Sequence, residues 1–156
     1  YLSSLKSLSL ISGDVYVWNN ITTQSMKLRE LLLVRIGITS ITDITNLEHM
    51  HYLYRLVLSW NKITTLSSFN FLPLMHLQYI VLEGNLLHNL DSNAFATKAF
   101  HYTLVDISNK AIRTMDTGTS EASTILQVET LNIAHNPIDI QTSLWILTIT
   151  KVKVGK

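Results

Sequence analysis

The chain has 156 residues, of which 47% are hydrophobic and 15% are charged, and its formal net charge is +1 at pH 7. This composition predicts one domain with a continuous core and excludes a disordered chain. With no basic cluster and no cysteine, the sequence excludes a footprint for nucleic acid or an anionic membrane, a disulfide framework and a cysteine nucleophile. No apolar run approaches the roughly 18 residues that would insert into a bilayer.

From its first residues onward, the chain repeats one unit. The pattern L-x-x-L-x-L-x-x-N-x-L, with other apolar residues allowed, recurs at intervals of 23, 25, 24, 25 and 26 residues, with units starting at Leu5, Leu28, Leu53, Leu77, Tyr102 and Val128. Alternation within each unit predicts a short strand with one face in the core. One unit cannot bury its apolar row alone, so we expect residues 1–156 to stack as a single solenoid domain of six repeats.

A polar residue follows several of the predicted strands. In "LYRLVLSWNKITTL" it is Asn61, and Asn85 and Asn136 hold the same place in later units. Where the chain turns inward, backbone groups lose contact with water, and an asparagine amide can both donate to and accept from them. We therefore predict a structural asparagine ladder, which is interrupted in the other units by Gly13, Ile36 and Lys110.

These units resemble the leucine-rich-repeat family, whose repeats are 20–29 residues long. Phe71 and Phe95, each 18 residues after its unit begins, and the phrase "LDSNAF" are similar to the longer repeats of extracellular members. The resemblance implies an α/β fold, namely a right-handed horseshoe with a parallel concave sheet and mostly loop or 3₁₀ structure on its convex side. "LTITKVKVGK" is then either a seventh strand or a cap. Because the family's cysteine-rich caps are missing, we expect a fragment of a longer ectodomain, the alternative being a family member that caps itself differently.

The concave face should carry the side chains that the core does not use. Leu32, Val57 and Val81 are predicted to be lateral neighbours, roughly 4.8 Å apart, in an apolar column with aromatic and charged neighbours. Such a patch is typical of an interface, although β-branched residues also favour strands for their own sake. The predicted partner-binding residues are Leu32, Val34, Arg55, Val57, Ser59, Trp60, Tyr79, Val81, Glu83 and Asp106.

Other candidate sites have weaker signals. Three histidines precede strands at similar places in their units, but we expect solvated side chains at His51, His76 and His101, with no metal site. The triplet Asn20-Ile21-Thr22 predicts glycosylation at Asn20. Residues 116–124, "DTGTSEAST", indicate a looped-out insertion on the convex side. No catalytic motif or phosphate-binding glycine cluster is present, so we expect neither enzymatic activity nor a cofactor.

The sequence thus favours a non-enzymatic protein-binding module. Phrases such as "LNIAHNPI" resemble Toll-like-receptor ectodomains or secreted immune leucine-rich-repeat proteins. That resemblance implies an extracellular glycoprotein of innate immune recognition that binds a protein ligand or co-receptor, with a homo- or heterodimer as one arrangement. The alternative is an intracellular scaffold or adaptor, because "ITSITDITNLEHM" also resembles the shorter cytosolic repeats.

Overall fold

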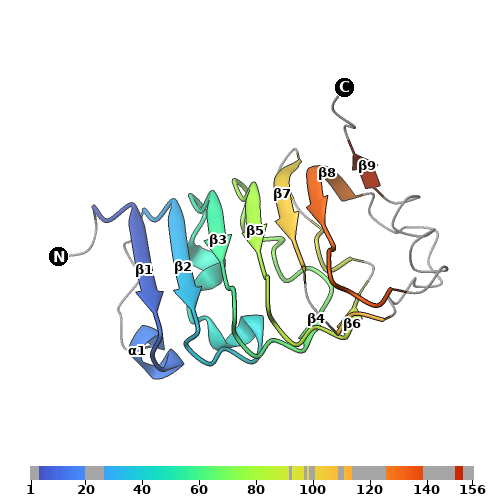
Figure 1. Ribbon diagram of the computed structural model, residues 1–156. Coiled ribbons are helices and arrows are strands. Elements are labelled where there is room, and N and C mark those ends of the chain that lie inside the picture. Colours follow the sequence, from blue (N-terminus) through green and yellow to red (C-terminus); the bar gives the residue numbers. More distant parts are fainter. Residues whose placement is uncertain are drawn as a thin grey trace.

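A computed structural model of the chain describes residues 4–19, 27–91, 93–96, 98, 101–108, 111–113, 126–138 and 150–152. Figure 1 shows one row of strands with the return segments passing behind and below it. In chain order the elements are β1 (Ser7–Ile11), α1 (Val15–Asn19), β2 (Glu30–Val34), η1 (Ile41–Asp43), η2 (Leu47–His49), β3 (Arg55–Val57), β4 (Thr65–Leu66), β5 (Tyr79–Val81), β6 (Asn89–Leu90), β7 (Tyr102–Asp106), β8 (Leu126–Asn132) and β9 (Thr150–Val152).

The main sheet is parallel throughout and its strands lie in chain order, β1-β2-β3-β5-β7-β8-β9. Its register places the same position of successive units side by side: Ser7 pairs with Glu30, Glu30 with Arg55, Arg55 with Tyr79, Tyr79 with Leu104, and Leu104 with Thr130. On the return side, β4 and β6 pair in parallel as a second, two-stranded sheet. The predicted parallel-sheet solenoid is confirmed.

The C-terminal segment contributes a strand. Residues 150–152 form β9, which pairs in parallel with residues 126–128 at the start of β8. Of the two alternatives for this part of the chain, the structure therefore has the seventh strand.

The α/β character expected from the sequence is wrong. Within the described residues, helix is limited to the five-residue α1 and the single 3₁₀ turns η1 and η2. Helices this short are not stable by themselves, and polar side chains compete for the backbone. At η1, for example, Ser40 accepts a hydrogen bond from the N–H of Thr42, and Asp43 accepts one from the N–H of Ser40, which closes a one-turn capping box.

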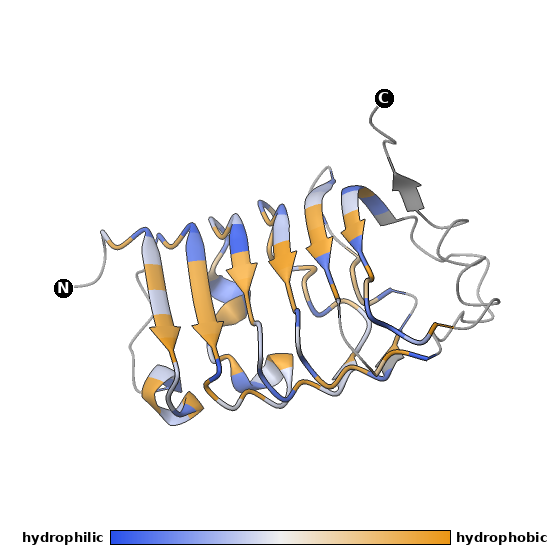
Figure 2. Ribbon diagram, viewed as in Figure 1, coloured by the Kyte–Doolittle hydropathy of each residue, from blue (hydrophilic) through white to orange (hydrophobic). Residues whose placement is uncertain are grey.

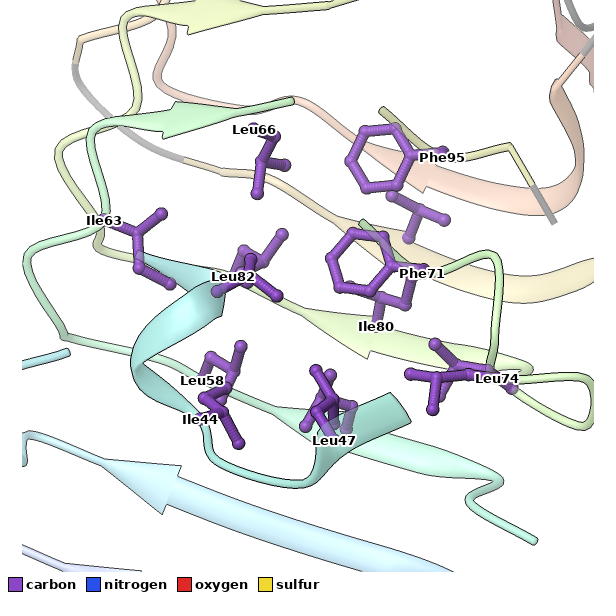
Figure 3. Close-up of a cluster of buried hydrophobic side chains, with 14 of the residues drawn as sticks. Ile44, Leu47, Leu58, Ile63, Leu66, Phe71, Leu74, Ile80, Leu82 and Phe95 are labelled. Atoms are coloured by element: carbon purple, nitrogen blue, oxygen red, sulfur yellow. The ribbon is translucent and has the colours of Figure 1, made fainter. Parts of the chain in front are cut away.

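The core is a continuous stack of aliphatic side chains between the sheet and the return segments. Figure 3 shows Leu58 and Leu82 from neighbouring coils pointing into it, and both are fully buried. A buried leucine of this kind contributes about 1.5–3 kcal/mol relative to exposure. Phe71 and Phe95 lie on the return side with their rings stacked at 5.8 Å and 12°, so corresponding positions of two coils also pack on each other there.

Figure 2 shows the hydropathy of this arrangement: hydrophobic residues fill most of β2 and β3, and polar residues lie where these two strands begin.

Asn61 joins two coils through its buried side-chain amide. Its oxygen accepts hydrogen bonds from the N–H groups of Ile36 (3.0 Å) and Ile38 (3.3 Å) in the preceding coil. Its nitrogen donates to the carbonyls of Leu33 (2.7 Å), also in the preceding coil, and Leu58 (2.9 Å) in its own coil. One side chain thus bonds four backbone groups at the turn, where water cannot reach them.

Asn85 repeats the arrangement one coil later. It accepts from the N–H of Ile63 (3.1 Å) and donates to the carbonyls of Leu58 (2.9 Å) and Leu82 (2.7 Å). Asn136 makes the equivalent contacts from a partly buried position, with the N–H of Ile112 and the carbonyls of Ile107 and Ile133. Lys110, at the equivalent place between them, lies outside the described residues.

The residue before each ladder position turns the chain through the left-handed region. Its φ lies between 55° and 70° in every described unit, at Ser12, Arg35, Trp60, Gly84 and His135. The N–H groups of Trp60 and Gly84 continue the ladder by donating to the carbonyls of Glu83 (2.8 Å) and Ser108 (3.0 Å). The turn therefore keeps one conformation in the five units where it is described, whichever side chain occupies it.

Asn85→Ala should lower the free energy of unfolding by about 1–3 kcal/mol, because the N–H of Ile63 and the carbonyl of Leu82 lose their partner in a buried place, while the carbonyl of Leu58 keeps only its bond from Asn61. Chemical denaturation measures the change. Asn19→Ala, which truncates an exposed asparagine at the end of α1, serves as the matched control and should change stability little. Equal stability of the two variants would contradict this account of the ladder.

The carboxylate of Asp43 contributes to the stability of the fold in a pH-dependent way. Burial raises the pKa of its carboxyl, but hydrogen bonds from the N–H groups of Thr39 and Ser40 and from the Thr39 hydroxyl outweigh it, so the pKa lies below the ordinary 3.8. Because the folded-state pKa is depressed, the carboxylate stabilises the fold above pH 3.8, and this contribution is lost as the pH falls through the folded-state pKa.

Asp43→Asn should therefore weaken the loss of stability between about pH 5 and the folded-state pKa. Urea unfolding at a series of pH values measures the slope. Glu48→Gln, which removes an exposed carboxylate from the neighbouring turn η2, should keep the wild-type slope. An unchanged slope in Asp43→Asn would show that the carboxylate of Asp43 does not stabilise the fold.

Candidate partner-binding face

The face of the main sheet that points away from the core, here called the open face, carries every second residue of each strand. Its central column pairs Leu32 with Val57, Val57 with Val81, and Val81 with Asp106. Leu32 and Val81 are half-buried, as are Val34 in the next column and Asp106. The structure therefore brings the predicted apolar column together as adjacent side chains.

Two members of the predicted set are less accessible than expected. Val57 is only 8% exposed and Ser59 only 6%. Val57 lies outside the contiguous hydrophobic core, so its burial comes from its neighbours Leu32 and Val81 on the same surface. Ser59 has a small side chain. Val57 and Ser59 therefore offer little surface to a partner, and the accessible apolar surface comes from Leu32 and Val81 beside Val57.

At the start of the strands the column is bordered by a polar and aromatic edge. Arg55 is exposed and pairs in register with Glu30 and Tyr79. The rings of Tyr54 and Tyr79 lie 5.0 Å apart at 58°. A hydrogen bond with Tyr79 raises the pKa of the Tyr54 hydroxyl, with smaller contributions from burial and from the charges of Tyr79 and Glu30. This edge presents tyrosine and arginine, the residue types that dominate protein interfaces.

Asp106 is held by its own neighbours. One carboxylate oxygen accepts hydrogen bonds from the N–H (2.9 Å) and hydroxyl (2.6 Å) of Ser108, and the other accepts from the side chain of Asn132 (2.9 Å). Both carboxylate oxygens of Asp106 are thus hydrogen-bonded within the protein. Asp106 therefore ends the apolar column with a polar residue but does not present a free carboxylate to a partner.

Trp60 lies at the other end of the strands, in the turn after β3. It is half exposed, and the guanidinium carbon of Arg35 lies 5.5 Å from the centroid of its ring. The ring lies directly over Gly84: a Cβ added there would meet the indole at 2.7 Å. The indole therefore packs on the backbone of Gly84, in space that any other residue would fill with its Cβ.

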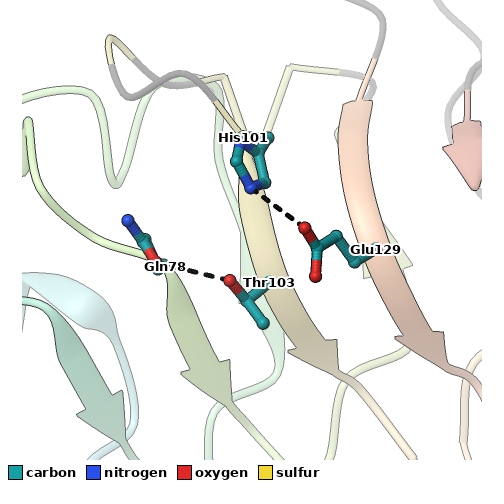
Figure 4. A network of polar contacts seen from close by, with 4 residues as sticks. All are labelled: Gln78, His101, Thr103 and Glu129. Carbon is teal, nitrogen blue, oxygen red and sulfur yellow. Dashed lines mark hydrogen bonds and ion pairs between the residues drawn. The ribbon is translucent and has the colours of Figure 1, made fainter. Parts of the chain in front are cut away.

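The three histidines do not form a common site. His76 contacts Tyr52 edge-on at 6.4 Å, and His51 is exposed. His101 reaches across to β8, where its Nε2 lies 3.3 Å from a carboxylate oxygen of Glu129. Figure 4 shows this pair beside the hydrogen bond from Thr103 to Gln78. Among the described residues, no group of three histidine, aspartate or glutamate side chains could hold a metal ion.

Two sequence-based predictions fall on residues that the structure does not describe, namely glycosylation at Asn20 and the insertion at residues 116–124. In the part of the chain that is described, no helix has the length and apolar character needed to cross a bilayer.

Arg35, Tyr54 and Gly84 were missed by the sequence analysis. Gly84 had a detectable signal, because a glycine immediately before a ladder asparagine stands where the other units carry a side chain. Arg35 and Tyr54 flank the strands, and their contacts with Trp60 and Tyr79 depend on side-chain directions that alternation does not encode.

Comparison with protein-family models, curated proteins and solved structures gave no match, so the role of this face is argued from its own geometry.

Gly84→Ala should displace the Trp60 indole and destabilise the protein, because the position combines a φ of 70° with no room for a Cβ. Gly37→Ala is the matched control: its φ is 84°, but a Cβ there meets nothing within 4 Å. Both variants should lose about 1 kcal/mol from backbone strain, and only Gly84→Ala should shift the Trp60 indole N–H resonance. Equal shifts in both variants would contradict the contact.

Proposed function

We propose that this chain is a non-enzymatic protein-binding module that uses the open face of the sheet. One observation carries the proposal, namely the apolar column in which Val57 lies between the half-buried Leu32 and Val81, with exposed Arg55 and Trp60 around it. The core does not need these side chains. An apolar patch bordered by tryptophan, tyrosine and arginine has the composition of an interaction hot spot.

We further propose that the chain is a leucine-rich-repeat protein whose open face is the concave side of a right-handed horseshoe. The six-fold unit, the one parallel strand per unit, the amide bridges of Asn61 and Asn85, and the stacked Phe71 and Phe95 all support this assignment. A stack of this kind binds without reorganising, because each coil is fixed by its neighbours and little ordering free energy is lost on association.

The resemblance to extracellular repeats favours a secreted or cell-surface role in innate immune recognition, with a protein ligand or co-receptor as the partner. An intracellular scaffold or adaptor is the second candidate. The observation that favours it is the stretch 38–50, "ITSITDITNLEHM", which resembles the shorter cytosolic repeats. Mass spectrometry of protein made through a eukaryotic secretory pathway separates the two, since an unmodified Asn20 would argue against the extracellular assignment.

Val81→Glu should abolish partner binding and keep the fold, because it places a charge in the centre of the apolar column without touching the core. A benzophenone side chain at Tyr79 tests this by photo-crosslinking to candidate secreted and cell-surface proteins. Thr65→Glu, an equal charge on exposed β4 of the return side, is the matched control and should leave crosslinking intact.

The reference position for crosslinking is Thr45, which is exposed in the return segment. Crosslinks that form equally well from Thr45, or that survive Val81→Glu in a protein with wild-type thermal unfolding, would place the binding surface elsewhere.

A further inference from the structure

A slot opens next to Trp60 on the side of the later strands. It has a volume of about 460 Å³ and is lined by Trp60, Glu83, Gly84, Leu86, Ser108, Ala111 and His135, together with the buried Asn85. The glycine contributes no side chain, so the indole forms one wall. His135, which occupies the same turn position as Trp60 in a later coil, forms another. Two large turn residues, Trp60 and His135, thus border the slot, and Gly84 adds no side chain to it.

The apolar part of the slot is suited to a long aliphatic stem. Leu86 is 52% exposed although its neighbour Leu87 is fully buried, and Ala111 adds a small apolar surface beside it. A leucine so exposed next to a tryptophan edge would lose unfavourable contact with water if a partner's side chain covered it.

Glu83 is the acidic residue among those that line the slot. Its backbone carbonyl accepts the hydrogen bond from the N–H of Trp60 (2.8 Å), which keeps the two residues side by side. Within the described part of the chain, no Lys, Arg or His nitrogen lies within 4.0 Å of this half-buried carboxylate. Asp106, by contrast, is fully engaged by Ser108 and Asn132. Among the described residues, Glu83 is thus an acidic group of the slot without a basic partner.

Arg35 does not pair with the carboxylate of Glu83. It follows β2, whereas the slot begins at Gly84 after β5, so along the strand order they lie on opposite sides of Trp60. Its guanidinium is placed at the indole ring, 5.5 Å from the centroid.

We propose that the slot accepts an arginine side chain of the partner protein, an inference that rests on the protein-binding function proposed above. The stem would lie against Leu86 and the edge of Trp60, and the planar guanidinium would pair with both carboxylate oxygens of Glu83. The planar guanidinium of arginine can donate to both oxygens of one carboxylate, whereas the ammonium group of lysine acts as a point charge. The slot would thereby select partners that carry an arginine at this position, a selectivity that the apolar column alone does not provide.

The capped tripeptide Gly-Arg-Gly is the probe, titrated into the ¹⁵N-labelled full chain while the indole N–H of Trp60 is followed by NMR. Trp60→Phe identifies that resonance among the three tryptophans. We expect a saturating shift with a dissociation constant on the order of 1 mM, a free energy of about 4 kcal/mol. The peptide with norleucine in place of arginine, which keeps the stem and removes the charge, should bind about tenfold more weakly.

Glu83→Gln should also weaken the arginine peptide about tenfold, whereas Glu48→Gln, an exposed carboxylate on η2, should leave its affinity unchanged. Equal affinity for the arginine and norleucine peptides, an unaffected Glu83→Gln variant, or no shift with any peptide would each overturn the proposal. These outcomes are distinct from the crosslinking test: if crosslinks at Tyr79 still depend on Val81, the open face binds a partner and only the arginine slot is wrong.

Discussion

The structure depends on how each coil satisfies the backbone groups at the turn after its strand. The turn is buried between coils, so its N–H and C=O groups cannot bind water, and each unpaired group would cost about 1–3 kcal/mol. Asn61 and Asn85 solve the problem by spanning two coils, since each amide bonds backbone groups of its own coil and of the preceding one. Each bridge therefore ties the turn of one coil to that of the coil before it.

This constraint also separates the residues of the fold from those of the open face. Inward positions such as Leu56 and Leu58 are fully buried, whereas Leu32 and Val81, which flank Val57 on the open face, are half-buried. At the turn position before the asparagine, the backbone is fixed in the left-handed region. The identity of its side chain is not fixed by the core, because the side chain points to the surface. A tryptophan there is costly in a conformation that favours glycine, and its contacts with Arg35 and Gly84 show that it is held in one place.

Much of this arrangement could be predicted from the sequence, and the failures have physical causes. The period of the apolar residues predicts the parallel register, because stacking equal units requires the same position to face itself in the next coil. The α/β label failed because polar side chains such as Ser40 and Asp43 cap single turns, so the described return segments form only short helical turns. Alternation placed Val57 on the correct face but could not reveal that its neighbours cover it. The slot beside Glu83 depends on a missing Cβ and on the direction of one indole, neither of which a strand pattern contains.

Native-state hydrogen exchange at the amide of Ile63 tests the central claim most directly, because this N–H is bonded to the side-chain oxygen of Asn85 in the next coil. If the asparagine bridges hold the coils together, Ile63 should exchange only when the stack opens, with a protection free energy equal to that of the buried strand amides. The exposed turn amide of Thr42, which bonds only the neighbouring Ser40 hydroxyl, should exchange far faster. Exchange of Ile63 as fast as that of Thr42 would contradict the account.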